Sequence, residues 1–116
     1  MRAIRGAITV EQNTDDAITA ATQELLAEVA RTNRVGPRDT ISMFFTLTPD
    51  LDAVFPARGA RAMGWDVPML DMQEVPVPGA LERCLRVLLH VEGRGPVHHC
   101  YLGGARALRP DLAGES

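Results

Sequence analysis

Residues 85–91 read LRVLLHV, and this stretch decides the fold class. Apart from Arg86 and His90, every residue in it is aliphatic, and the turn-rich segment GRGP follows at 93–96. A short apolar run bounded by turn residues is typical of a β-strand. Because side chains alternate along a strand, one face carries only apolar residues, namely Leu85, Val87, Leu89 and Val91. The other face carries Arg86, Leu88 and His90, so we predict a strand with one core face and one charged face.

Further strands are predicted on both sides of this stretch. They are the alternating or β-branched segments Ala3–Val10, Ile41–Leu47, Val67–Glu74 and His98–Leu102. The segment ISMFFTL at 41–47 is apolar enough to predict a strand that is covered on both faces. Pro76, Pro78 and Gly79 break the continuation of the third segment.

Two helices are predicted between the strands. Apolar residues recur at helical spacing at Ile18, Ala21, Leu25 and Val29. Asn13 or Thr14 offers an N-cap, and the amphipathic pattern continues to about Thr32. A second, short helix is predicted over Ala57–Met63, with Pro56 near its start and Gly64 as its stop. The segment Thr48–Asp50 opens a short helical or turn segment.

Strands interleaved with helices predict an α/β (α+β) fold, with helices packed on a mixed β-sheet. The length of 116 residues fits a single domain over residues 1–116. We expect the chain from about residue 103 to 116 to be an irregular, mobile tail.

The basic residues are unusual in kind: all twelve are arginine, and the sequence has no lysine. Any bound anion must therefore be held by guanidinium, main-chain N–H or hydroxyl groups, and the planar guanidinium suits carboxylates. The net charge of −3 argues against nucleic-acid binding. No apolar run reaches the length of a membrane span, and Arg5 interrupts the first apolar stretch, so we expect a cytoplasmic protein without membrane association.

Nucleophile and metal chemistry find little support in the sequence. His98 and His99 are adjacent, so in an extended strand they point to opposite faces and are poorly arranged for one metal ion. No glycine-rich phosphate loop and no nucleophile elbow are present. Cys84 and Cys100 lack a metal-binding or redox spacing, so we expect both to be reduced and buried.

The arginines are the better candidates for function. Arg86 interrupts the most apolar strand and Arg5 lies within another, and a charge in such a position is rarely buried without a partner. Arg58 and Arg61 are three residues apart and share one helix face. Glu74, just before the proline break, is the natural acidic counterpart. Five further arginines are expected on the surface: Arg31, Arg34, Arg38, Arg94 and Arg106.

Five separated blocks of the sequence form a specific pattern. They are IRGAITVE at 4–11, TPDLDAVFPARGAR at 48–61, VPMLDMQEVPVPG at 67–79, LERCLRVLLHVE at 81–92, and HHCYL with ALRPDL at 98–112. In this order, the blocks resemble the trimeric α/β-type bacterial chorismate mutases. The resemblance implies a homotrimeric, barrel-like assembly with active sites between neighbouring subunits. It also implies the rearrangement of chorismate to prephenate without any cofactor or metal.

The resemblance assigns roles to individual residues. Arg5 corresponds to the arginine that binds a substrate carboxylate, Arg86 to the one near the ether oxygen, and Glu74 to the acid at the ring hydroxyl. Tyr101 matches the tyrosine that supports the enolpyruvyl carboxylate. The other substrate-binding positions implied are Phe55, Ala57, Arg58 and Arg61 from a neighbouring subunit, Met69, Leu70 and Asp71, and Leu108 and Arg109 in the tail that closes over the pocket.

Asp71 departs from the family, which has a small neutral residue at this position. In one interpretation its main-chain N–H still serves the substrate, and its side chain turns to water or to an arginine. In another, Asp71 and Glu74 form a coupled pair with one proton, which could divert chorismate to a cyclic ketal. Residues three apart on a strand face opposite ways, which opposes the second interpretation unless the nearby prolines bend the chain.

A third possibility is a non-catalytic trimer that binds a small carboxylate or a partner protein. Such a protein need not retain Arg5, Glu74, Arg86 and Tyr101 together, so the complete set favours an enzyme.

Overall fold

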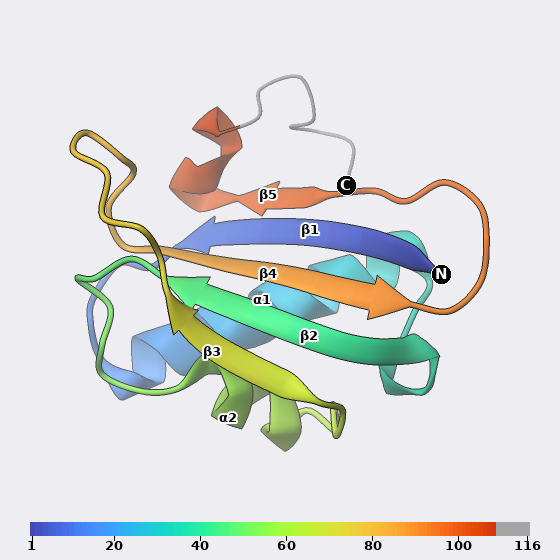
Figure 1. Cartoon of the computed structure of the whole chain (residues 1–116). Coiled ribbons are helices and arrows are strands. Elements are labelled where there is room, and N and C mark those ends of the chain that lie inside the picture. The colour runs from blue at the N-terminus through green and yellow to red at the C-terminus, as the bar shows by residue number, and fades with distance from the viewer. Residues whose placement is uncertain (109–116) are drawn as a thin grey trace.

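Five strands form one mixed sheet in the order β3-β2-β4-β1-β5 in the computed structural model, which describes residues 1–108 (Figure 1). The strands are β1 (Arg2–Thr9), β2 (Thr40–Leu47), β3 (Met69–Gln73), β4 (Cys84–Val91) and β5 (Cys100–Leu102). The central strand β4 contains the LRVLLHV stretch and runs antiparallel to both β1 and β2. The outer pairs β2–β3 and β1–β5 are parallel.

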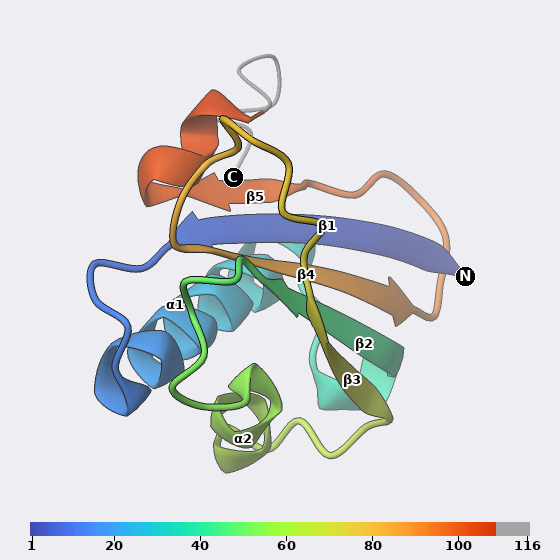
Figure 2. The same cartoon turned by 60° about the vertical axis from the view of Figure 1, so that its left-hand side comes forward.

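Both α-helices pack on the same face of this sheet (Figure 2). They are α1 (Asp15–Asn33) and α2 (Pro56–Ala62). The core lies between them and the sheet, where Ile4, Leu25 and Leu89 are fully buried. None of the described helices combines the length and the apolar character needed to cross a membrane.

The first helix begins at one of its two predicted N-caps and ends close to the predicted position. The Thr14 hydroxyl accepts a hydrogen bond from the main-chain N–H of Ala17 at 3.1 Å, and Asp15 and Asp16 occupy the first turn, where the helix dipole favours negative charge. The helix ends at Asn33, one residue beyond the prediction, because Arg34 adopts the left-handed conformation with φ of 54°.

Two predicted strands are shorter in the structure. The strand expected over 67–74 is β3, and the strand expected over 98–102 is β5, which starts only at Cys100. The main chain of His98 is hydrogen-bonded to the side chain of Asn33 instead of to a neighbouring strand, which explains the late start. The segment from Thr48 to Asp50 forms a turn and no helix.

The expectation of an irregular tail from residue 103 is wrong for its first part. Gly103–Ala107 forms a 3-10 helix, η2, in which Ala105 is buried. The main-chain N–H of Gly104 donates a hydrogen bond to the Thr9 hydroxyl at 2.8 Å, which attaches this helix to β1. A second short 3-10 helix, η1, spans Pro37–Asp39. Residues 109–116 lie outside the described part of the chain.

The prediction that residues 41–47 are covered on both faces is also wrong for the single chain. In β2 the helix-facing Met43 and Phe45 are fully buried, whereas Phe44, which faces the other way, is only partly buried and Ile41 is exposed. The helices cover one face only, so the second face of the sheet stays open. This open face carries the candidate site.

Candidate functional site

The candidate site is a pocket on the open face of the sheet. Strand register aligns Arg86 of β4 with Ala7 on one side and Thr46 on the other, and Tyr101 of β5 pairs with Ala7. Residues aligned in this way point to the same face. The pocket has a volume of about 430 Å³ and its principal lining side chains are Arg5, Phe44, Thr46, Arg86, Leu88 and Tyr101.

An ion pair lies at the edge of this pocket. Glu74 Oε1 is 2.5 Å from Arg86 Nε, without the alignment of a regular hydrogen bond, and both side chains are partly buried. The main-chain N–H of Glu74 donates to the Leu47 carbonyl at 2.7 Å, so the main chain of Glu74 is held beside β2 just after the end of β3. The predicted pairing of Arg86 with Glu74 is therefore present.

Tyr101, which lines the pocket, belongs to the same buried cluster as Cys84. This small cluster also contains Ala7 and Ala105, and Leu108 packs against it. Burial raises the pKa of the Cys84 thiol to about 11, although the charge of Arg86 acts in the opposite direction. This cysteine is a packing residue in its neutral form.

Arg5 is an exposed side chain at the rim of the same pocket. Its main-chain N–H donates a hydrogen bond to Nδ1 of His99 at 3.0 Å. The structure thus brings three of the residues predicted from sequence, Arg5, Arg86 and Tyr101, to one pocket, with Glu74 against Arg86.

The residues predicted for the other wall lie elsewhere in the chain. Phe55, Arg58 and Asp71 line a second pocket of about 420 Å³, formed by the loop that leads into α2 and by β3. Ala57 is buried at the start of α2 and Arg61 is exposed near its end. Within the described residues, Met72 alone lines both pockets.

Asp71 faces α2 and not the Arg86 pocket. Its Oδ1 accepts a hydrogen bond from the main-chain N–H of Ala57 at 3.1 Å. Burial raises the pKa of the Asp71 carboxyl, and the Ala57 hydrogen bond and the charge of Arg61 partly offset this effect. Asp71 therefore contacts the start of α2 while Glu74 contacts Arg86, and the geometry does not support the proposed Asp71–Glu74 pair.

The remaining predicted residues are spread around these features. Met69 packs against the core, and Leu70 is 57% exposed; neither lines one of the two pockets described above. Leu108 packs against the cluster that contains Tyr101, and Arg109 lies outside the described residues. No cluster of three or more potential metal ligands occurs among residues 1–108.

Sequence reasoning missed Thr46 and His99. Thr46 lines the Arg86 pocket, and its buried hydroxyl has no hydrogen-bond partner among the described residues. Strand alternation puts Thr46 on the same face as Phe44, but only the register between β2 and β4 shows that Arg86 is its neighbour. His99 was considered only as a metal ligand.

A small α+β domain with two arginines and a tyrosine around a mostly apolar pocket has the features of a protein that binds a compact, carboxylate-bearing ligand. Comparison with known proteins identifies the class of enzyme. The family model described as chorismate mutase type I matches residues 1–112, and the chain belongs to this family.

Full-length relatives support this assignment. The chain is 42% identical to the chorismate mutase AroH of Bacillus subtilis (strain 168), over 97% of this chain and 93% of that protein. It is 46% identical to the chorismate mutase AroH of Thermus thermophilus, over 97% of this chain and 96% of that protein. A solved structure of a chorismate mutase from Clostridium thermocellum is 49% identical and superposes with a TM-score of 0.90, over 92% of this chain and 99% of that one.

The resemblance inferred from the five sequence blocks is therefore confirmed, as is the mixed α+β fold. The chain is a chorismate mutase, an isomerase whose substrate is chorismate. The two alternatives, a diverted chorismate enzyme and a non-catalytic carboxylate binder, are not favoured by these comparisons.

Proposed function

We propose that this enzyme binds chorismate in the Arg86 pocket and converts it to prephenate by electrostatic and conformational stabilisation alone. One observation carries the proposal: Arg5, Arg86 and Tyr101 line one pocket, and Glu74 contacts Arg86 at its edge. Chorismate has two carboxylates, and the guanidinium of Arg5 and the hydroxyl of Tyr101 are suited to hold them.

The reaction requires little covalent chemistry from the protein. It is unimolecular: the bond between the ether oxygen and the ring breaks as a new C–C bond forms, so no atom is gained or lost. The enzyme has to hold the substrate in its reactive shape and stabilise the charge that separates in the transition state. No acid, base or nucleophile is needed for this.

Arg86 is assigned to the negative charge that grows on the ether oxygen. A preorganised donor at such an oxygen contributes about 3–4 kcal/mol to the transition state. Glu74 is assigned to the ring hydroxyl and to the partial positive charge of the ring. Its ion pair with Arg86 also holds the guanidinium in position before the substrate arrives.

The second wall of the site is proposed to come from a neighbouring subunit of a homotrimer. Two features support this. Phe55, Arg58 and Asp71 line a different pocket from Arg86 in the same chain. Large apolar side chains are also exposed, Leu70 at 57% on the open sheet face and Phe55 at 65% in the loop before α2, and contact with a second subunit would bury them.

In this assembly, the neighbouring subunit contributes Phe55, Ala57, Arg58 and Arg61, together with Asp71, which lines the same pocket as Phe55 and Arg58. Leu108 and Arg109 cover the site, and Met69 and Leu70 shape its edge. We also propose that the enzyme works in the cytoplasm. The two unpaired cysteines, Cys84 and Cys100, are compatible with a reducing compartment.

Subunit complementation tests the proposed site. Arg86→Ala and Arg61→Ala each remove one wall and should each be nearly inactive. Co-expressed as mixed trimers, they should recover about one quarter of wild-type activity, because random assortment pairs an intact Arg86 with an intact neighbouring Arg61 at about one site in four. Prephenate formation from chorismate, followed by product analysis, measures the recovery.

The matched control is the mixture of Arg86→Ala with Arg5→Ala. Both residues belong to the same wall, so no mixed arrangement rebuilds a complete site and activity should stay low. Two results would contradict a site shared between subunits. One is recovered activity in this control mixture, and the other is no recovered activity in the mixture of Arg86→Ala with Arg61→Ala.

A further inference from the structure

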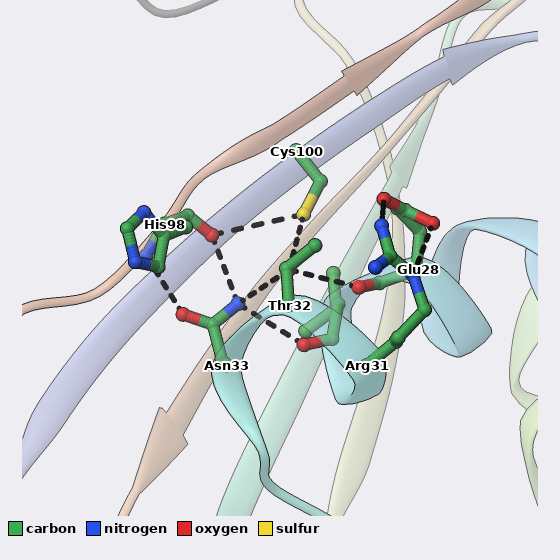
Figure 3. Close-up of polar contacts among 7 residues, drawn as sticks. Glu28, Arg31, Thr32, Asn33, His98 and Cys100 are labelled. Atoms are coloured by element: carbon green, nitrogen blue, oxygen red, sulfur yellow. Dashed lines mark hydrogen bonds and ion pairs between the residues drawn. The ribbon is translucent and has the colours of Figure 1, made fainter. Parts of the chain in front are cut away.

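The residue before β5 is held by the end of the first helix. The side-chain amide of Asn33 forms two hydrogen bonds with the main chain of His98 (Figure 3). Asn33 Oδ1 accepts from the His98 N–H at 2.7 Å, and Nδ2 donates to the His98 carbonyl at 2.9 Å. This pair of bonds fixes the position of the main chain one residue before His99.

The residue after His99 is held equally closely. Cys100 pairs with Gly6 at the start of the β1–β5 ladder, and its Sγ lies 3.3 Å from the Thr32 hydroxyl (Figure 3). A Cβ atom on Gly6 would lie 3.3 Å from the Cys100 carbonyl oxygen and 3.1 Å from Leu25 Cδ1, so glycine permits the close approach of β1 here. His99 is thus bracketed by two fixed main-chain positions.

From this fixed position the His99 side chain reaches β1. Its Nδ1 accepts the main-chain N–H of Arg5 at 3.0 Å, although the two residues are 94 positions apart. Main-chain pairing of β1 with β5 begins only at Gly6, so the imidazole supplies the acceptor one residue beyond the ladder. A nitrogen that accepts a hydrogen bond carries no proton, so this bond requires a neutral ring with its proton on Nε2.

We propose that His99 is a positioning residue for the chorismate mutase reaction: it accepts the main-chain N–H of Arg5 and so holds the Arg5 guanidinium at the rim of the pocket. The inference rests on the proposed function, in which Arg5 binds a substrate carboxylate. In this role, His99 connects the end of α1 to the site: Asn33 holds the main chain of His98, and the ring of the next residue, His99, accepts the Arg5 N–H.

Steady-state kinetics of three variants test the role of the acceptor. His99→Ala removes it and should raise KM by roughly 3- to 10-fold with kcat within about twofold, since one hydrogen bond that positions a binding group is lost. His99→Asn keeps an oxygen near the position of Nδ1 and should restore KM to near the wild-type value. His98→Ala is the matched control and should leave KM near the wild-type value, because Asn33 holds the main chain of His98, which this substitution retains. Equal KM increases in His99→Ala and His99→Asn would overturn the inference.

The Arg5→Ala variant separates this inference from the proposed function. If Arg5→Ala leaves KM unchanged, Arg5 does not bind the substrate and the proposed function fails. If Arg5→Ala raises KM and His99→Ala does not, only the positioning role fails. In the Arg5→Ala background, His99→Ala should produce little further change, because the group that it positions is absent.

Nitrogen-15 NMR of the folded wild-type enzyme gives a readout that does not depend on turnover or on the stability of a variant. The expected spectrum at neutral pH shows His99 Nδ1 without a proton and Nε2 with one. A proton on Nδ1 would overturn the inference.

Discussion

The two faces of β4 differ in composition and in environment. On the helix-covered face, Leu85, Val87, Leu89 and Val91 are at most 3% exposed. On the open face, Arg86, Leu88 and His90 are only partly buried, and Arg86 contacts Glu74. One strand thus contributes to folding through one set of alternate residues and presents charge through the other.

This division explains how a chain of 116 residues accommodates both a core and a candidate site. The helices bury the apolar face and leave the second face, which carries the Arg86 pocket, uncovered. A charge on the covered face would lose its hydration without a partner, whereas a charge on the open face keeps access to water or substrate. Substitutions on the two faces should therefore have different effects.

The largest effect is expected on the open face. Arg86→Ala should lower kcat by about 10²–10³-fold, because a donor to the developing charge on the ether oxygen is removed. Its free energy of unfolding should change little compared with the loss of a core side chain. Initial rates of chorismate consumption measure the first effect and urea unfolding the second.

The control is Arg94→Ala, an exposed arginine in the loop before β5, which should keep wild-type kcat. A variant of Arg86 that raises KM and leaves kcat intact would contradict its assignment to the transition state.

On the covered face the order of effects should reverse. Leu89 is fully buried, so Leu89→Ala should lower the free energy of unfolding by about 2–5 kcal/mol through lost burial and a new cavity. The folded fraction should keep near wild-type kcat. Urea unfolding at one fixed protein concentration measures the change. The control is Leu88→Ala, at the neighbouring position on the open face, which should lower the free energy of unfolding by less than Leu89→Ala does. An equal or greater decrease for Leu88→Ala would contradict the distinction between the two faces.

The smallest effect concerns Asp71, whose carboxyl faces α2. Burial raises its pKa in the folded state above the ordinary value, so folding favours the protonated form. The resulting contribution to stability is present below the pKa of the unfolded chain and is lost as pH rises through the folded-state pKa. Asp71→Asn retains an acceptor for the Ala57 N–H and does not titrate.

The difference in unfolding free energy, wild type minus Asp71→Asn, should therefore fall as pH increases from about 4, near the ordinary value for aspartate, towards neutral. Urea unfolding at several pH values measures it, and groups common to both proteins cancel in the difference. A difference that rises with pH would show that the folded state favours the charged carboxylate.

Elements with strong local signals were predicted well from sequence. The two faces of β4 follow from alternation, and the start of α1 follows, to within one residue, from the two N-cap candidates Asn13 and Thr14 and the apolar spacing after them. Strand ends were predicted less well, because the start of β5 depends on the Asn33 side chain, which is remote in sequence. The 3-10 helix after β5 was missed because its anchor is the Thr9 hydroxyl on another strand.

The candidate site shows the same limit. Arg5 and Arg86 were recognised as unusual from their apolar surroundings, and the family resemblance, now confirmed, assigned them to the site. The contact of the Asp71 carboxyl could not be predicted in this way. Its hydrogen bond to the start of α2, instead of a contact with Glu74, depends on how α2 packs beside β3.

The sequence by itself determined the alternation of β4, the limits of α1, the exclusive use of arginine as a cation, and the family. These properties depend on residue type and on spacing along a few turns or strand positions. Only the tertiary structure decided that Arg86 lies against Glu74, that Thr46 lies beside it, and that His99 holds the main chain of Arg5. Such contacts join segments far apart in sequence, and strand register and helix packing select them.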